Sequence, residues 1–267
     1  MAFNDRRKDR IKSAFSGAKN YNRNAKIQKL VAGRLASHIA RLELPTSPRV
    51  LEIGCGTGFL TTAMVEAGVR GDWLVTDLSP KMVAECQASF DDTVNLLNVQ
   101  FAVLDGENET PSGGPFDLIC SSLALQWFDN QIDGLKRMLG WLKPGGHLIA
   151  TTLTSNTFWQ WRNAHALENI ECGTLQFHDV ADFAALPNSK CSLYCIDEEH
   201  GDGITFLKSL KAIGATIPAA HHMPLGPARL RTVLSRFEKA GSCVTYEVTT
   251  VHLRGAGDAG QCYYFMP

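Results

Sequence analysis

A glycine-rich turn between an apolar strand and a helix constrains this chain more than any other stretch of its sequence. The apolar residues within 50–53 predict a buried strand, and residues 60–66 have the apolar spacing of a helix. Gly54, Gly56 and Gly58 lie between these two segments. Such a turn places backbone N–H groups at the N-terminus of a helix with no side chains in the way. It therefore predicts a binding site for a polar, nucleotide-like ligand.

The spacing of these glycines differs from that of the common dinucleotide-binding fingerprint. The fingerprint is G-x-G-x-x-G, whereas here the third glycine comes one position early and is followed by Phe59. Glu52 stands two residues before the first glycine, so the pattern is E-x-G-x-G-x-G. A glycine turn alone can also be a tight strand-to-helix connection, and the interpretation therefore depends on the rest of the chain.

Strands and helices alternate after this turn. Apolar and β-branched runs predict further strands at residues 72–77, 99–103, 116–122 and 147–153. Ser79 and Pro80 are a typical N-cap and first residue of a helix, and another helix is expected at 131–142. Strands that alternate with helices at this spacing predict an α/β fold with a parallel, doubly wound sheet and right-handed crossovers.

We expect a single domain, residues 1–267, built from four parts. Along the chain these are N-terminal helices (1–45, with a break at 17–24), a cofactor-binding core (49–153), a largely helical insertion that forms a lid (155–190) and the C-terminal part of the sheet (191–267). The last part is expected to contain a strand at 192–196, helices at 204–213 and 227–240, and a long strand near the edge of the sheet at 243–253.

The composition argues against several classes of protein. With 45% hydrophobic and 20% charged residues, the chain has the balance of a soluble globular protein. It contains no apolar run of eighteen residues, and its first residues are charged without an apolar stretch behind them, so neither a membrane span nor a secretory signal is expected. The eight cysteines form no C-x-x-C pair, which favours reduced thiols in a cytoplasmic protein over a metal site.

The charge is unevenly distributed although the net charge is only −1. Residues 1–49 hold twelve Lys/Arg against three Asp/Glu, a local charge of +9, and the remainder holds 14 against 24, or −10. This asymmetry suggests an anionic partner for the N-terminal face, although a charge run is often only a solvated helix surface. No recognition motif for nucleic acid accompanies the basic residues.

Asp77 ends the second predicted strand, 23 residues after Gly54. In nucleotide-binding α/β folds a carboxylate at this place accepts hydrogen bonds from ribose hydroxyls, and a simple capping role is the alternative. Met82 follows on the next helix, where it would pack on an adenine ring or belong to the core.

The E-x-G-x-G-x-G pattern, followed by Asp77 at the end of the next strand, resembles motif I of the class I S-adenosylmethionine-dependent methyltransferases. The resemblance implies a Rossmann-like, mostly parallel seven-stranded sheet, S-adenosyl-L-methionine as cofactor and S-adenosyl-L-homocysteine as product. In this family an acid at the position of Asp105 accepts a hydrogen bond from the adenine amino group, and a turn aspartate is the alternative. The cofactor-binding residues that it implies are Glu52, Gly54, Cys55, Gly56, Gly58, Asp77, Leu78, Met82, Asp105, Gly106, Ser121 and Ser122.

Four further segments resemble a narrower family, the malonyl-[acyl-carrier protein] O-methyltransferases of biotin synthesis. These segments are residues 14–28, 121–128, 207–215 and 245–248. The resemblance implies methyl transfer to the free carboxylate of a malonyl group on an acyl carrier protein or coenzyme A. We expect the enzyme to be a monomer. An acidic carrier protein would then dock on the basic N-terminal helices. The chain departs from the family at 156–162, where a glycine-containing stretch is usual, so the acyl pocket is the least defined part.

Methyl transfer to a carboxylate makes modest chemical demands. A carboxylate with a pKa of about 4 is ionised at pH 7, so no general base is required. The enzyme has to align the reacting atoms and exclude water. By resemblance and position we expect Arg162 to hold the substrate carboxylate, Tyr21 to close the site and Trp127 to form an apolar wall. A surface arginine and a core tryptophan are the alternatives, and His165, His221 and His222 are expected to be surface or packing residues.

Three rival functions remain at this point. A carboxylate methyltransferase for a small free acid such as trans-aconitate shares the Gln126–Trp127 pair but has no need of basic N-terminal helices. A non-catalytic binding partner that retains the cofactor fold is less compatible with the intact glycines and acids. A nicotinamide-dependent oxidoreductase is disfavoured by the early third glycine.

Overall fold

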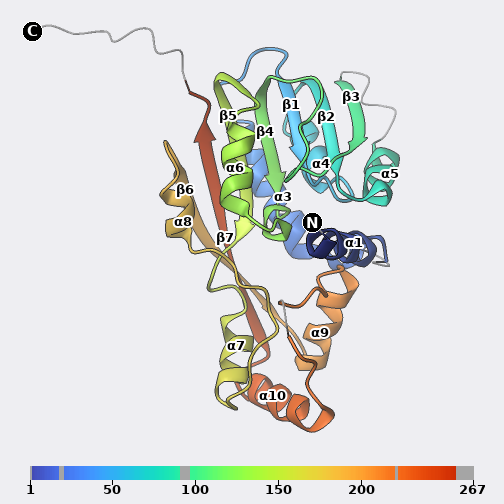
Figure 1. Ribbon diagram of the computed structural model, residues 1–267, viewed down its shortest axis with the longest axis vertical. Helices are drawn as coiled ribbons and strands as arrows, with labels where there is room; N and C mark the ends of the chain where they lie inside the picture. Colours follow the sequence, from blue (N-terminus) through green and yellow to red (C-terminus); the bar gives the residue numbers. More distant parts are fainter. Residues whose placement is uncertain (1, 18–20, 91–96, 220–221, 257–267) are drawn as a thin grey trace, which may run out of the picture.

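The fold is a seven-stranded sheet with helices on both faces (Figure 1). The computed structural model describes residues 2–17, 21–90, 97–219 and 222–256. The strand order is β3-β2-β1-β4-β5-β7-β6, and β7 alone runs opposite to the other six strands. The strands are β1 Arg49–Ile53, β2 Gly71–Asp77, β3 Leu97–Val103, β4 Phe116–Ser122, β5 Leu142–Leu153, β6 Lys190–Glu199 and β7 Cys243–Arg254. This is the doubly wound, mostly parallel seven-stranded sheet predicted from the sequence.

The central strands are buried because both faces of the sheet are covered. The helices are α1 Ala2–Ser16, α2 Tyr21–Asn24, α3 Lys26–Ile39, α4 Phe59–Glu66, α5 Pro80–Ser89, α6 Gln131–Leu139, α7 Trp159–Ala166, α8 Val180–Ala184, α9 Gly203–Ala212 and α10 Pro227–Lys239, with a 3₁₀ turn η1 at Leu125–Trp127. One apolar cluster joins α3, α4 and α5 to the sheet, and another joins α6 and α8 to its other face. This burial on two sides explains the continuous apolar runs of the parallel strands.

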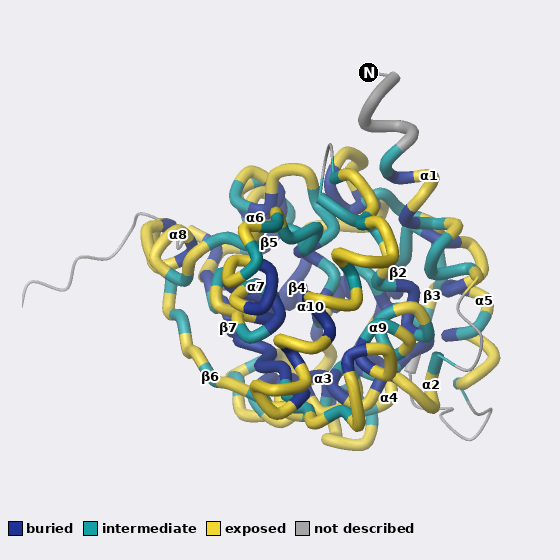
Figure 2. The backbone as a smooth tube through the Cα atoms, turned by 90° about the horizontal axis from the view of Figure 1, so that it is seen from below, coloured by how far each residue is buried: buried dark blue, intermediate teal, exposed yellow. Residues whose placement is uncertain are grey.

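A third apolar cluster lies beyond the sheet, at the lower end of Figure 1. The antiparallel pair β6 and β7 continues past the other strands, and α7, α9 and α10 pack around it. Four aromatic side chains meet there. The ring centroid of Phe206 lies 5.5 Å from that of Phe158 and 5.4 Å from that of Trp161, and Trp161 lies 5.4 Å from Phe237. Seen from below, the buried stretches lie inside and the outer sides of the helices are exposed (Figure 2).

The structure corrects one expectation about the second half of the chain, the largely helical insertion. The segment 155–190 contains only α7 and the short α8, and the chain between them has no regular structure, so this insertion is not largely helical. Moreover, α7 packs against α10 and β7, whereas α1 lies at the carboxyl ends of the parallel strands (Figure 1). The long strand expected near the edge of the sheet at 243–253 is β7, which is second from the edge, and β6, longer than expected, pairs along its outer side.

Candidate functional site

The glycine turn folds as its sequence requires. Gly54, Gly56 and Gly58 have φ angles of 73°, 54° and 93°, a left-handed region that side chains rarely adopt. A Cβ atom on Gly54 would lie 2.4 Å from the Cβ atom of Ala124, so this glycine allows the chain after β4 to approach β1. At Gly56 an added Cβ atom would meet nothing within 4 Å, which leaves its backbone open toward a cavity.

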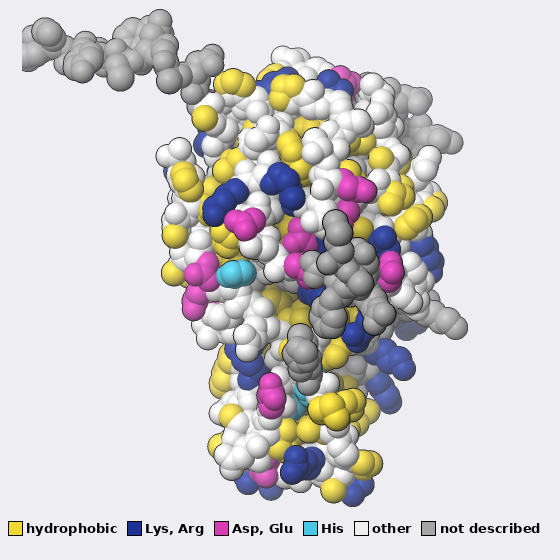
Figure 3. All heavy atoms as spheres, in the orientation of Figure 1, with side chains coloured by type: hydrophobic (Ala, Val, Ile, Leu, Met, Phe, Trp, Pro, Cys, Tyr) yellow, Lys and Arg dark blue, Asp and Glu magenta, His cyan; other side chains and the backbone are white. Residues whose placement is uncertain are grey.

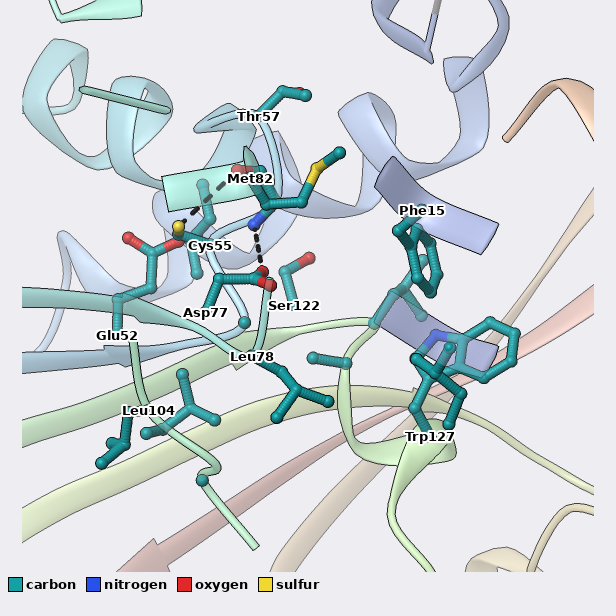
Figure 4. A pocket seen from close by; sticks show the side chains of 18 of the residues that line it. Phe15, Glu52, Cys55, Thr57, Asp77, Leu78, Met82, Leu104, Ser122 and Trp127 are labelled. Atoms are coloured by element: carbon teal, nitrogen blue, oxygen red, sulfur yellow. Dashed lines mark hydrogen bonds between the residues drawn. The ribbon is translucent and has the colours of Figure 1, made fainter. Parts of the chain in front are cut away.

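Asp77 is fixed at the end of β2 by two backbone N–H groups. Gly56 N donates to Asp77 Oδ2 at 2.9 Å, and Ser79 N donates to Oδ1 at 2.8 Å. Burial raises the pKa of Asp77 above its usual value, although these two hydrogen bonds act in the opposite direction. Each carboxylate oxygen keeps further acceptor capacity toward the cavity, as two neighbouring ribose hydroxyls require (Figure 4).

Glu52 is fully enclosed beneath the glycine turn. Thr61 Oγ1 donates to Glu52 Oε2 at 2.7 Å. Burial raises the pKa of Glu52 to about 7, the hydrogen bond from Thr61 opposes the shift, and the nearby Asp77 adds to it. A carboxyl group with such a pKa changes its charge close to neutral pH.

A first cavity opens at the carboxyl ends of β1, β2 and β4. The predicted cofactor residues that line it are Glu52, Gly54, Cys55, Gly56, Asp77, Leu78, Met82, Asp105, Gly106 and Ser122. Gly58 and Ser121 do not line it: Gly58 precedes α4, and Ser121 Oγ donates to Ile53 O at 2.8 Å. Figure 4 shows Glu52 and Leu104 on one side of this cavity and Phe15 and Trp127 on the other.

Lys8 of α1 closes one end of this cavity. Its Nζ lies 2.7 Å from Asp105 Oδ2 and 2.9 Å from Glu107 Oε2. Burial alone would raise the pKa of Asp105, but hydrogen bonds from Lys8 and Asn108 hold it below its usual value. The acid expected to face an adenine amino group is therefore already paired with a cation that the sequence patterns did not single out.

A second, larger cavity adjoins the first. It has a volume of about 470 Å³, against about 130 Å³ for the first, and its walls are mainly apolar. They include Leu153 at the end of β5, Phe158 and Trp161 from the segment around α7, and Leu207 and Leu210 from α9. The residues that line both cavities are Phe15, Tyr21, Gln28, Leu123 and Trp127. An elongated apolar group in the second cavity would therefore reach the first at these five side chains.

Of the three residues expected to act on the substrate, Tyr21 and Trp127 lie at this junction and Arg162 does not. The Arg162 guanidinium donates to the backbone carbonyls of Thr157 and Ser155, and it lines neither cavity. These hydrogen bonds connect α7 to the turn before it. Arg162 therefore does not lie at the substrate site where it was expected. His165 and His222, expected at the surface or in packing, line the second cavity, and His221 lies outside the described residues.

Phe15 and Gln28 are site residues that the sequence patterns missed. Both belong to segment 14–28, whose family resemblance points to Tyr21 but not to these two residues. The Phe15 ring makes an edge contact with Trp127 at 5.2 Å and with Tyr21 at 6.5 Å between centroids. An aromatic residue on a basic helix could be read as core packing, so no local signal marked it.

Comparison with known proteins identifies the family. A family model described as a methyltransferase domain matches residues 24–194. A malonyl-[acyl-carrier protein] O-methyltransferase of Magnetococcus marinus is 37% identical over 248 residues, which cover 91% of each chain. The chain belongs to this methyltransferase family. Within the family, the biotin biosynthesis bifunctional protein BioCD of Bordetella avium is 42% identical over 234 residues, 87% of this chain but 49% of that protein, so the chain spans about half its length.

Solved structures support the fold of the family. A methyltransferase of Bacillus halodurans superimposes with a TM-score of 0.57 at 13% identity, covering 84% of this chain and 98% of that one. Across the described ranges, no helix is long and apolar enough to cross a membrane. In the same part of the chain, no cluster of three or more His, Cys, Asp or Glu residues could hold a metal ion.

Proposed function

We propose that this chain is a cytoplasmic, monomeric enzyme that methylates the free carboxylate of a malonyl group carried by acyl carrier protein. The product, a malonyl methyl ester, would serve as primer for the pimeloyl chain of biotin. The observation that carries the proposal is the apolar second cavity that meets the first cavity at one shared wall, in a chain of this family. Such a cavity suits the thioester end of an acyl group better than a small, multiply charged acid such as trans-aconitate.

The residues of the first cavity fit S-adenosyl-L-methionine. Asp77 presents carboxylate oxygens where ribose hydroxyls would donate, and the open backbone at Gly56 admits a ligand close to the turn. Met82, only 2% exposed, offers an apolar surface in the same wall. When bound, the cofactor supplies a methyl group on a positively charged sulfur. We assign cofactor binding to the first cavity on this fit.

The chain itself contributes alignment and exclusion of water. The acceptor carboxylate is ionised at neutral pH, so no side chain has to remove a proton. Phe15 of α1 and Tyr21 of α2 contribute to the shared wall, together with Gln28 of α3, and their side chains would exclude water there. A dry junction favours the step because two opposite charges disappear during transfer.

The docking surface for the carrier protein needs cations that are not already paired. Arg7 donates to Asp129 at 2.6 Å, and Lys8 is paired within the first cavity, so these two are used internally. Residues 10–42 hold eight Lys/Arg and residues 203–237 hold five, and neither stretch contains an Asp or Glu. The two stretches meet where α2 packs beside α9, and Lys and Arg side chains gather at the level of α9 along the right-hand edge of Figure 3.

Four exposed cations lie where α2 packs beside α9. They are Arg23 on α2, Lys26 on α3, and Lys208 and Lys211 on α9. None of the four has an ion pair in the part of the chain that is described. The same three helices also line the second cavity, through Tyr21, Gln28, Leu207 and Leu210. The four cations therefore lie beside the cavity proposed for the acyl group. An acidic carrier protein would be attracted there while its acyl arm enters the cavity.

Reversing these four charges to Glu is expected to raise KM for malonyl-carrier protein by about tenfold or more at low salt, because attraction becomes repulsion. KM for malonyl-pantetheine, which lacks the carrier protein, should change less than twofold. Reversal of Lys136, an exposed lysine with an acidic neighbour on its own helix, is the control and should leave both values unchanged. Equal increases for both substrates would refute docking at this surface.

The function itself is tested by offering malonyl-carrier protein, malonyl-CoA and trans-aconitate separately with cofactor labelled in its methyl group. Methylation of a malonyl thioester is the expected result. Labelling of trans-aconitate alone would replace the proposal with the small-acid alternative. Cofactor binding without transfer to any of the three would support the non-catalytic alternative.

A further inference from the structure

The wall shared by the two cavities carries polar groups without partners in the protein. Tyr21, Gln28 and Trp127 contribute a phenol hydroxyl, a carboxamide and an indole N–H to it. Among the described residues, none of these side-chain groups forms a hydrogen bond, and none is sealed away from the cavities as a buried orphan. All three can donate a hydrogen bond, and all three are uncharged at neutral pH.

No free cation competes with them along the described walls. Lys8 is the only Lys or Arg that lines either cavity, and it is paired with two carboxylates. Arg162 is bound to backbone carbonyls. Of the imidazoles, His165 has Nδ1 2.9 Å from Trp161 O and a further hydrogen bond to Cys172, and the His222 ring packs over Gly173.

We propose that Tyr21, Gln28 and Trp127 form the binding site for the acceptor carboxylate, which is therefore held by neutral donors and not by an arginine. The identity of the acceptor, a malonyl thioester, rests on the proposed function, whereas the carboxylate site rests on the junction itself. Tyr21 and Trp127 were expected at the substrate site from the sequence. Gln28 was not, and its role in the reaction is new.

Neutral donors suit the chemistry of the attacking group. A carboxylate in an apolar site needs hydrogen bonds to replace its lost water. A bidentate guanidinium would satisfy it more strongly, but it would also withdraw charge from the attacking oxygen. In the transfer, one carboxylate oxygen forms the bond to the methyl carbon as the carbon–sulfur bond breaks, the electron pair stays on sulfur, and no proton moves. The donors have only to hold the carboxylate in line.

Aromatic packing fixes the positions of these donors. Phe15 contacts both Tyr21 and Trp127, and Tyr21 stacks on Phe59 with ring planes 27° apart and centroids 6.2 Å apart. Burial, and secondarily the charge of Asp77, raises the pKa of Tyr21 far above its usual value. The phenol therefore stays protonated, and remains a donor, over the whole working range of pH.

The proposal is tested with Gln28→Leu, Gln28→Glu and Arg162→Gln. Each variant is assayed on whichever carboxylate the unaltered protein methylates, and its dissociation constant for S-adenosyl-L-homocysteine is measured by calorimetry. Gln28→Leu should lower kcat/KM by about tenfold to a hundredfold, the usual effect of a lost hydrogen bond to a charged group, with the dissociation constant changed less than threefold. Arg162→Gln, assayed below its melting temperature, should keep kcat/KM within about twofold.

Gln28→Glu gives a readout that a structural role would not produce. An ionised carboxylate at the junction repels the substrate, so activity should be lower than in Gln28→Leu at pH 8. It should recover as the pH falls and the new side chain becomes a protonated donor. Normal kcat/KM in Gln28→Leu, or a large loss in Arg162→Gln with intact folding, would overturn the proposal. Failure of the unaltered protein to methylate any malonyl thioester would count against the acceptor alone.

Discussion

Replacing Asp77 with asparagine is expected to weaken binding of S-adenosyl-L-homocysteine by about a hundredfold or more, as measured by calorimetry. The Asp77 carboxylate accepts from Gly56 N and Ser79 N and retains acceptor capacity toward the cavity. Asparagine has a single acceptor atom, so it has to turn an N–H group either against a backbone N–H of the glycine turn or toward the hydroxyls of the ligand. Both arrangements lose hydrogen bonds to a charged group.

Asp117→Asn is the matched control for this substitution. Asp117 is also a buried carboxylate of the sheet, and it accepts from Arg49 N and Lys143 Nζ, each at 2.7 Å. It lies at the opposite end of the strands, away from both cavities. The control should lower the melting temperature and leave the ligand dissociation constant unchanged. A similar loss of affinity in both variants would mean that Asp77 acts through the stability of the sheet alone.

Glu52→Gln is expected to remove a pH dependence of stability worth about 2–3 kcal/mol between pH 5 and pH 8. The folded protein raises the pKa of Glu52 from 4.5 to about 7, so the folded state holds this proton more tightly than the unfolded state does. The resulting stability is fully present below the unfolded pKa and is lost as the pH rises through about 7. Above that pH, the unaltered protein has an ionised carboxylate in a buried site, and glutamine does not.

Urea unfolding of both proteins across this pH range measures the difference. Glu85→Gln, which changes an exposed glutamate paired with Lys81 on α5, is the control and should leave the slope of stability against pH unaltered. Because Asp77 also has a raised pKa and its charge acts on Glu52, the difference between the two profiles reports on Glu52 together with its interaction with Asp77. Parallel profiles for Glu52→Gln and the unaltered protein would contradict the assigned pKa.

The sequence predicted the part of the site that depends on local structure. Gly54, Gly56 and Asp77 lie at ends of adjacent parallel strands, and apolar periodicity is enough to locate those ends. Arg162 lies outside both cavities, and the helical pattern of α7 does not state what its guanidinium meets. That outcome depends on the free carbonyls of Ser155 and Thr157 in the turn before the helix.

The N-terminal part of the site depends on contacts between residues far apart in the chain. Gly214, at the end of α9, has no room for a side chain because Ala14 and Phe15 lie against it. Arg7 reaches Trp127, 120 residues away. Neither contact has a signature in a periodic pattern, so Phe15 and Gln28 could be placed at the junction only by the folded structure.

The position of α1 has a consequence for ligand affinity. Its residues Lys8, Ile11 and Phe15 line the first cavity, and Phe15 also lines the second. A ligand in one cavity that restrains α1 also restrains the α1 side chains that line the other cavity. By thermodynamic linkage, cofactor and acceptor then raise each other's affinity by the same factor. The helix would make the two binding events cooperative within a single chain.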